Sequence, residues 1–373
     1  MGMMSGRRTA AIAVVLLGAL GLSACAYLHK PLGQLPQGER LSAVQASPQY
    51  RDGAFRNEVP SPPRPDGLAF AWRVVQGQFA AKDRPTPPAP LPAVKTDLTA
   101  LPLDQDIVVW LGHSSYFVQV GGRRLLIDPV FSDHAAPLPW MVKAFDGTSI
   151  YRVEDIPEVE AVLISHDHYD HLDYASMKGL LSKTRVVIGG LGNGAHLEHW
   201  GYPPEKIREM DWNQTVELAP DLKIHVLPAQ HYSGRFMNRN QSLWASFAVE
   251  TPHRRLYFSG DTGFGPHFAT IAKRFESFDL VALDAGQYNE RWADIHMNPE
   301  EASRAAEILR ARAMLTAHAG RFSLARHAWD EPFQRAAAAS VGKSYRLLTP
   351  KIGETVRLGD EAQQFQTWWT AVE

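Results

Sequence analysis

Several features that would narrow the class of this protein are scarce in its sequence. The 373 residues include one cysteine, Cys25, so no disulfide can form within the chain. The apolar run at residues 10–22 is shorter than the roughly 20 residues that a transmembrane helix needs. Basic residues are not in excess, since 38 Lys and Arg stand against 40 Asp and Glu, for a net charge of -2. This balance offers no basic field for a polyanion, and we expect no nucleic-acid partner.

The first 25 residues predict export. Arg7 and Arg8 precede the apolar run, as in a secretory signal peptide. The run ends in Leu-Ser-Ala-Cys at residues 22–25, which resembles a bacterial lipobox and implies cleavage before Cys25 and lipidation of its thiol. An ordinary signal peptide with a chance cysteine is the alternative. We predict a lipid-anchored protein of the bacterial cell envelope, and Ala26 after the cysteine favours the outer membrane or periplasmic face of a diderm source.

Composition divides the chain into three parts: a lipoprotein signal peptide at 1–24, a Pro-rich extension at 25–105 and a catalytic domain at 106–373. The Pro-rich stretches at 61–65 and 85–90 are expected to be extended and semi-rigid. Between them, Leu68, Trp72, Val75 and Phe79 recur at helical spacing and predict a short amphipathic helix that begins near Asp66. We expect this stripe to dock on its own domain in preference to lipid.

Residues 166–171, His-Asp-His-Tyr-Asp-His, concentrate potential metal ligands in one loop. They follow an apolar run at 161–164, which predicts a buried strand, and precede Asp173, which can cap a helix. Imidazole and carboxylate are ligands that zinc and related transition metals take. Surface histidines beside a helix cap are a simpler interpretation, but three His and two Asp in six residues after a buried strand favour a site for two metals.

Three later predicted strands also end in ligand residues: 223–227 lead to His231, 256–260 lead to Asp261, and 313–317 lead to His318. The series HxHxDH, His, SGDTG, His resembles the metallo-β-lactamase superfamily over about residues 107–358. The resemblance implies an α/β fold in four layers, the αβ/βα sandwich, with metals at the edge between two sheets. It also implies a ligand set: His166, His168 and His231 for one metal, Asp170, His171 and His318 for the other, and Asp261 as the bridge.

Two such metals, expected to be Zn²⁺ with iron or manganese as alternatives, can hold a hydroxide between them and polarise the bond under attack. This hydrolysis needs no organic cofactor. The position of the only cysteine excludes β-lactamases with a Cys ligand, and the inserted domain and basic surface of nucleases are not visible. Thioesterases and lactonases of the same fold remain open.

More specific stretches resemble N-acyl-phosphatidylethanolamine-hydrolysing phospholipase D: Trp110-Leu111-Gly112-His113, Tyr288-Asn289-Glu290-Arg291-Trp292 and His296-Met297-Asn298-Pro299-Glu300-Glu301-Ala302. Asp167 departs from the Asn of that family. The resemblance implies a zinc-dependent phosphodiesterase that cleaves N-acyl-phosphatidylethanolamine or a related membrane phospholipid. The alternatives are a lactonase or thioesterase, or a non-catalytic envelope lipoprotein. The expected partners are a phospholipid and, through the anchor, a membrane surface, while the oligomeric state stays open, a homodimer included.

Three features near the motif have two interpretations each. Asp128 follows a hairpin whose turn is Gly121-Gly122, and it either orients a metal-binding His or caps the loop before Pro129. His296 precedes a helix with a capping box at 298–301, and it either contacts the phosphate and assists the leaving group or hydrogen-bonds near the cap. The apolar loop at 137–145 either meets an apolar substrate or completes the core. With Asp261, Asp128 and His296 are the predicted catalytic residues.

Overall fold

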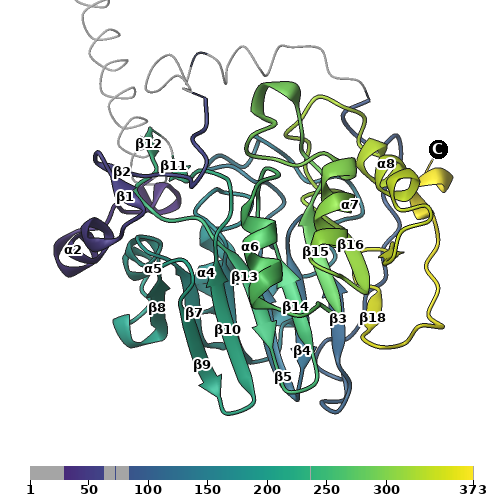
Figure 1. Cartoon of the computed structure of the whole chain (residues 1–373), viewed down its shortest axis with the longest axis horizontal. Helices are drawn as coiled ribbons and strands as arrows, with labels where there is room; N and C mark the ends of the chain where they lie inside the picture. The colour runs from purple at the N-terminus through teal and green to yellow at the C-terminus, as the bar shows by residue number, and fades with distance from the viewer. Residues whose placement is uncertain (1–28, 63–71, 73–83, 236, 373) are drawn as a thin grey trace, which may run out of the picture.

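The computed structural model describes residues 29–62, 72, 84–235 and 237–372. Two seven-stranded sheets form its centre, in the orders β18-β3-β4-β5-β6-β7-β8 and β17-β16-β15-β14-β13-β10-β9 (Figure 1). The strands of the first sheet are β3 (Ile107–Trp110), β4 (Tyr116–Val120), β5 (Arg123–Ile127), β6 (Val159–Ile164), β7 (Thr184–Gly190), β8 (Ile207–Met210) and β18 (Thr355–Arg357). Those of the second are β9 (Thr215–Ala219), β10 (Leu222–Leu227), β13 (Ser246–Glu250), β14 (Arg255–Phe258), β15 (Leu280–Asp284), β16 (Ala313–Ala317) and β17 (Arg346–Leu348).

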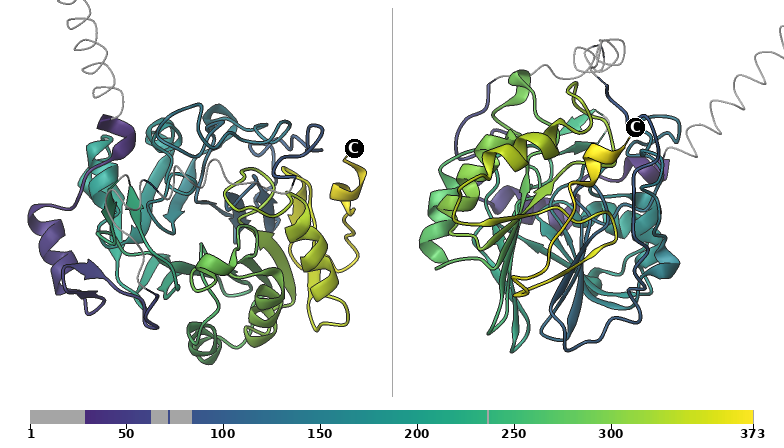
Figure 2. Two further views of the ribbon diagram at one scale, coloured as in Figure 1. Left: turned by 90° about the horizontal axis from the view of Figure 1, so that it is seen from above. Right: turned by 90° about the vertical axis from the view of Figure 1, so that its right-hand side faces the viewer.

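The two sheets face one another across the main core, and helices cover their outer faces (Figure 2). Val118 and Leu163 of the first sheet belong to the same buried cluster as Ile224 and Phe247 of the second. Outside the first sheet lie α4 (Tyr174–Leu180) and α5 (Gly194–His199), and outside the second lie α6 (His267–Arg274) and α7 (Pro299–Ile308). A further helix, α8 (Glu331–Ala339), packs beside α7. This arrangement confirms the predicted four-layer sandwich.

The turn and the two helix caps that the sequence predicts are present in the structure. Strands β4 and β5 pair antiparallel around Gly121 and Gly122, whose φ angles of 57° and 71° lie in the left-handed region that glycine tolerates. Asn298 caps α7 by accepting from the backbone N–H of Glu301, while the Glu301 side chain accepts from Asn298. Asp173 caps α4 in the predicted way, because its side chain accepts from the backbone N–H of Ser176.

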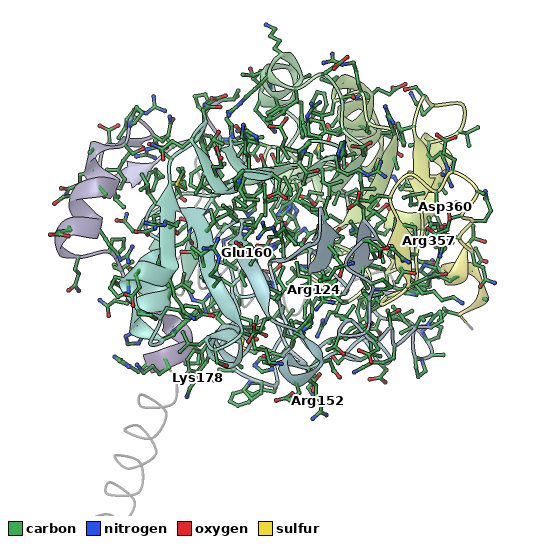
Figure 3. The ribbon with its side chains drawn as sticks, turned by 90° about the horizontal axis from the view of Figure 1, so that it is seen from below. Arg124, Arg152, Glu160, Lys178, Arg357 and Asp360 are labelled. Carbon is green, nitrogen blue, oxygen red and sulfur yellow. The ribbon has the colours of Figure 1, made fainter. Side chains whose placement is uncertain are left out.

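The predicted ligands share one edge of the sandwich because of strand direction. Strands β5, β6 and β7 run parallel, as do β14, β15 and β16. Their carboxyl ends therefore meet at one edge, where the loops after β6, β14 and β16 carry the metal motif, Asp261 and His318. Figure 3 views the opposite edge, with Arg124 and Glu160 near the starts of β5 and β6.

The N-terminal extension contains regular elements that the sequence analysis did not predict, ahead of its Pro-rich stretches. It contains α2 (Gly38–Ala46) and a small sheet of β1 (Tyr50–Arg51) and β2 (Ala54–Phe55). Arg40 of α2 forms ion pairs with Glu198 and Glu209 of the catalytic domain, which hold the helix against it. The signal peptide and Cys25 lie outside the described residues, as does the predicted amphipathic helix except for Trp72.

The apolar loop at 137–145 completes the core at one end. Phe145 is buried in the main core, whereas Trp140 leaves 67% of its surface exposed. The loop thus anchors itself at one end and presents an aromatic side chain to solvent. Among the described helices, none has the length and apolar composition that crossing a bilayer requires.

Candidate metal centre

The structure brings all seven predicted ligands into one buried cluster. In the first group, ligand atoms of His166, His168, His231 and Asp261 all lie within 4.8 Å of one another. Nε2 of His166 is 2.8 Å from Nδ1 of His168, which is 3.3 Å from Nε2 of His231. Three imidazole nitrogens thus converge on one small volume, as a zinc site requires.

The second group lies beside the first and contains Asp170, His171 and His318, together with His113. Oδ2 of Asp170 is 3.4 Å from Nε2 of His171 and 3.2 Å from Nε2 of His318. The same oxygen is 2.8 Å from Nε2 of His113, which fixes the carboxylate from its other side. His113 lies in the stretch 110–113 that resembles the phospholipase, but the sequence alone indicates no role for it.

Asp261 lies between the two groups. Its Oδ2 is 3.6 Å from Nε2 of His166 in the first group and 3.3 Å from Nε2 of His318 in the second. Its Oδ1 is 3.2 Å from Nε2 of His171. One carboxylate therefore reaches both sets of ligands, which is the position that a bridging ligand needs.

Most of the ligand rings are held from behind by a second hydrogen bond. Asp128 lies 2.8 Å from Nδ1 of His171, and Ser165 donates to the same carboxylate through its backbone N–H and its hydroxyl. Nδ1 of His231 donates to the carbonyl of Ile295 at 3.0 Å. Such outer partners fix the tautomer and ring orientation of a ligand. The geometry at Asp128 is the one that its orienting role requires.

Asp284 at the end of β15 is a second residue that the sequence analysis missed. Its Oδ1 lies 3.3 Å from Nδ1 of His318, and its Oδ2 lies 2.8 Å from Nδ1 of His296. The backbone N–H of Thr262 also donates to Oδ2. Asp284 therefore connects a predicted metal ligand with the predicted catalytic histidine, whose ring stacks on that of His318 at 5.0 Å between centroids.

The electrostatics of the cluster suit cations. Burial lowers the pKa of His168 to about 4, and burial with repulsion from His171 lowers the pKa of His166 well below its usual value. Burial alone would raise the pKa of Asp261, but His171 and His318 outweigh it and hold that pKa well below its usual range. Burial alone would lower the pKa of His171 and His318, but Asp261 outweighs it and raises the pKa of His318 to about 10 and that of His171 well above its usual value. A metal ion bound at these two residues would therefore displace protons.

Nε2 of His171 and Oδ1 of Asp261 are two of five buried atoms at the cluster that lack a hydrogen-bond partner among the described residues; the other three belong to His113, Asp284 and His318. A buried polar atom without a partner costs about 1–3 kcal/mol, so such atoms are uncommon without a reason. These two atoms lie 3.2 Å apart, where Asp261 meets the second ligand group. Coordination would satisfy both, and the residues present therefore fit a pair of metal ions.

The backbone is strained at the same place. His113, Asp128 and His318 have φ angles of 55°, 41° and 61°, in the left-handed region that side chains other than glycine rarely adopt. Each costs about 1–3 kcal/mol and persists only where the surroundings impose it, typically at functional sites. All three residues contact the ligand cluster directly.

Asp167, the departure from the phospholipase pattern, lies within the motif but belongs to neither of these ligand groups. Its carboxylate accepts from the backbone N–H of Gly234 at 2.6 Å and from the hydroxyl of Ser242 at 2.8 Å. The residue therefore fastens the metal loop to the loop after His231, and the substitution leaves the ligand set intact.

Comparison with known proteins agrees with this geometry. Residues 123–319 match the family model described as the beta-lactamase superfamily domain. The chain belongs to the metallo-β-lactamase superfamily. It is a metal-dependent hydrolase of that fold. The metallo hydrolase Igni18 from the archaeon Ignicoccus hospitalis shares the fold with a TM-score of 0.53 at 20% identity, over 68% of this chain and 97% of its own.

Three relatives of this metallo-β-lactamase superfamily chain differ in how much of it they cover. An uncharacterised protein of Mycobacterium tuberculosis is 36% identical over 366 residues, covering 94% of this chain and 97% of its own. The N-acyl-phosphatidylethanolamine-hydrolyzing phospholipase D 1 of Caenorhabditis elegans is 33% identical over 232 residues, 58% of this chain and 64% of its own. The outer membrane protein RomA of Klebsiella pneumoniae is 52% identical over 106 residues, 28% of this chain and 80% of its own.

Asp128→Asn is expected to weaken metal binding 10- to 100-fold, roughly the usual cost of losing an outer partner of a ligand. The amide keeps the volume of Asp128 but removes the charge that faces His171. Competition between the stripped protein and a chromophoric chelator for Zn²⁺ measures the affinity. Unchanged affinity would assign Asp128 to the loop before Pro129 alone.

Proposed function

We propose that this superfamily member is a zinc-dependent phosphodiesterase of phospholipase D type, acting on N-acyl-phosphatidylethanolamine or a related membrane phospholipid. The observation that carries the proposal is the placement of His296 against the ligand cluster, since the ligands themselves serve many hydrolases of this fold. The similarity to the nematode phospholipase supports the substrate class.

The residues divide the work of the reaction. When bound, the two metal ions supply a Lewis acid for a phosphoryl oxygen and lower the pKa of water. The seven ligands hold those ions, while Asp128 and Asp284 keep His171 and His318 in orientation. Hydrolysis adds the oxygen of water to phosphorus and breaks the bond from phosphorus to the ethanolamine oxygen. The products are phosphatidic acid and an N-acylethanolamine.

His296 is the candidate proton donor for the departing oxygen. Its Nδ1 is hydrogen-bonded to Asp284, which directs Nε2 to the other side of the ring, away from that carboxylate. The ring is 9% exposed and packs against those of His231 and His318. A histidine held in this way can contact the phosphate or protonate the leaving alkoxide, and it lies close enough to the ligands to do either.

A membrane location would bring the enzyme to such a substrate. Lipidation at Cys25 would tether the chain to the cell envelope, and a relative is called an outer membrane protein. Trp140 of the apolar loop is exposed on the catalytic domain, where an aromatic side chain can enter a lipid headgroup layer. We propose the outer membrane or the periplasmic face, with phospholipid as the partner and no nucleic acid.

The direct test incubates the purified protein with N-acyl-phosphatidylethanolamine in mixed bacterial lipids and identifies products by mass spectrometry. Parallel reactions contain a lactone and a thioester. We expect phosphatidic acid and N-acylethanolamine to appear together. Intact phospholipid beside rapid opening of the lactone or thioester would reassign the activity, and no turnover of any substrate by metal-loaded protein would favour a binding lipoprotein.

A further inference from the structure

Residues 29–62 of the N-terminal extension contact loops at the edge of the domain that carries the metal cluster. We call residues 29–62 the N-terminal strap; they include α2, β1 and β2, drawn in purple in Figure 1. The small sheet of the strap lies beside that of β11 (Gly234–Arg235) and β12 (Asn238–Arg239), where Phe55 donates to the carbonyl of Asn240 at 2.9 Å. Strands β11 and β12 belong to the loop that follows His231. The strap therefore meets a ligand-bearing loop directly.

Asn57 of the strap binds the backbone of His231 on both sides. Its side-chain Nδ2 donates to the carbonyl of His231 at 2.8 Å, and its Oδ1 accepts from the backbone N–H of His231 at 3.1 Å. The neighbouring Gln230 adds a third link, because its Nε2 donates to the carbonyl of Val59 at 2.7 Å. The side-chain amide of Asn57 thus hydrogen-bonds to both the backbone N–H and the backbone carbonyl of a predicted metal ligand.

This pairing fixes the ligand nitrogen of His231. The ring is already held by its Nδ1, which donates to Ile295, so a change in backbone position would tilt Nε2 relative to its neighbour in His168. Metal–nitrogen distances of about 2.0–2.1 Å leave little tolerance for such a tilt. The position of His231 therefore depends on Asn57, which precedes it by 174 positions in the sequence.

A second contact connects the strap to the metal motif itself. Arg235 is 3% exposed, and its Nη1 donates to the carbonyls of Asp167 and Leu172, which flank the last three ligand positions of the motif. Its Nε and Nη2 both donate to the carbonyl of Pro31 in the strap, at 3.2 and 2.5 Å. The strap thereby completes the hydrogen bonding of a buried guanidinium that holds both ends of the motif.

Attachment of the strap to the catalytic domain does not by itself explain the contacts of Asn57 and Pro31. The ion pairs of Arg40 with Glu198 and Glu209 join α2 to α5 and β8, away from every ligand. The contacts of Asn57 and Pro31 instead reach two loops that together carry five of the seven ligands: the motif loop with four of them, and the loop with His231. Side chains that fix ligands from outside the coordination shell are worth about 10- to 100-fold in metal affinity.

We propose that the N-terminal strap is a positioning element of the metal centre, acting through Asn57 on His231 and through Pro31 on Arg235. Asn57 is then a positioning residue, since it touches a ligand and neither metal nor substrate. This role holds for any reaction that the metals support, and it does not depend on the phospholipase assignment.

The test measures Zn²⁺ affinity of stripped protein by competition with a chromophoric chelator, without substrate. Asn57→Ala is expected to weaken Zn²⁺ affinity 10- to 100-fold at the site that contains His231, which is the usual range for an outer partner. The affinity of the other site should stay within about twofold of the wild-type value. The matched control is Gln119→Ala. Gln119 is also a side-chain amide that bonds two backbone carbonyls, those of Pro102 and Gln105, at the opposite end of the sheet. It should lower thermal stability without changing either zinc affinity.

Gln230→Ala serves as the second variant, because it removes only the bond to Val59 and should weaken the same site by a smaller factor. If Asn57→Ala does not fold, the Zn²⁺ affinities of Gln230→Ala test the proposal in its place. Selective weakening of one site in either variant supports the proposal. If both sites keep wild-type affinity while stability falls as in Gln119→Ala, the strap is a docking element only and the proposal is wrong.

Discussion

Asp261→Asn is expected to reduce hydrolysis of every substrate by about 10³-fold, the upper end of the cost of losing one preorganised electrostatic group. Asp261 is the residue whose two oxygens reach both ligand groups, within 3.2 to 3.7 Å of four histidines. The amide keeps the size of the side chain but supplies no negative charge to hold two cations together. Both sites should lose affinity, because their separation is no longer fixed.

The control for this variant is Asp279→Asn, which makes the same change before the start of β15, where Asp279 accepts from the backbone N–H of Arg255. It should retain activity and metal. Turnover of bis-p-nitrophenyl phosphate and elemental analysis measure both quantities. An Asp261→Asn protein with normal turnover and a full metal complement would show that Asp261 does not bridge the groups.

His296→Gln is expected to lower kcat for N-acyl-phosphatidylethanolamine by about 10²–10⁴-fold, the usual contribution of general acid catalysis. The effect should nearly vanish with bis-p-nitrophenyl phosphate, because nitrophenolate leaves without a proton. Metal content should stay unchanged, since His296 is not one of the seven predicted ligands: its ring hydrogen-bonds to Asp284 and only packs against the rings of His231 and His318. The dependence on the leaving group therefore separates proton donation from a structural role.

His253→Gln is the matched control, since His253 is exposed in the turn between β13 and β14 at the edge far from the cluster. Both substrates should be turned over at wild-type rates. Equal losses on the two substrates in His296→Gln would instead indicate that His296 supports the cluster or contacts the phosphate without donating a proton.

Local and periodic signals predicted strands that end in potential ligands, and the family resemblance supplied the four-layer fold and the full ligand set. The motif at 166–171, Asp261 and His318 each follow a run of buried residues, and parallel strands bring such ends together. Asp284 follows the same rule, because it ends β15, which lies between β14 and β16, but no motif in the sequence distinguishes it from other strand-end carboxylates. His113 was harder to predict. Its contact with Asp170 spans 57 positions and depends on a left-handed backbone that no pattern at 110–113 signals.

The N-terminal strap could not be predicted because its structure depends on distant partners. Helix α2 begins at Gly38, and Gln37 before it makes no side-chain cap, so local propensity for a helix is weak. What holds it is Arg40 with Glu198, 158 positions away in sequence. Asn57 likewise looks like an ordinary loop residue until its partner, His231, is known.

The central claim is that this superfamily member holds two metal ions between the seven ligands. Anomalous diffraction from crystals of protein purified without added metal, with elemental analysis of the same sample, tests it most directly. The account predicts two ions per chain, identified as zinc by elemental analysis. They should lie roughly 3.5–4 Å apart, and both should contact Asp261. A fully active sample with one ion per chain, or with none, would contradict it.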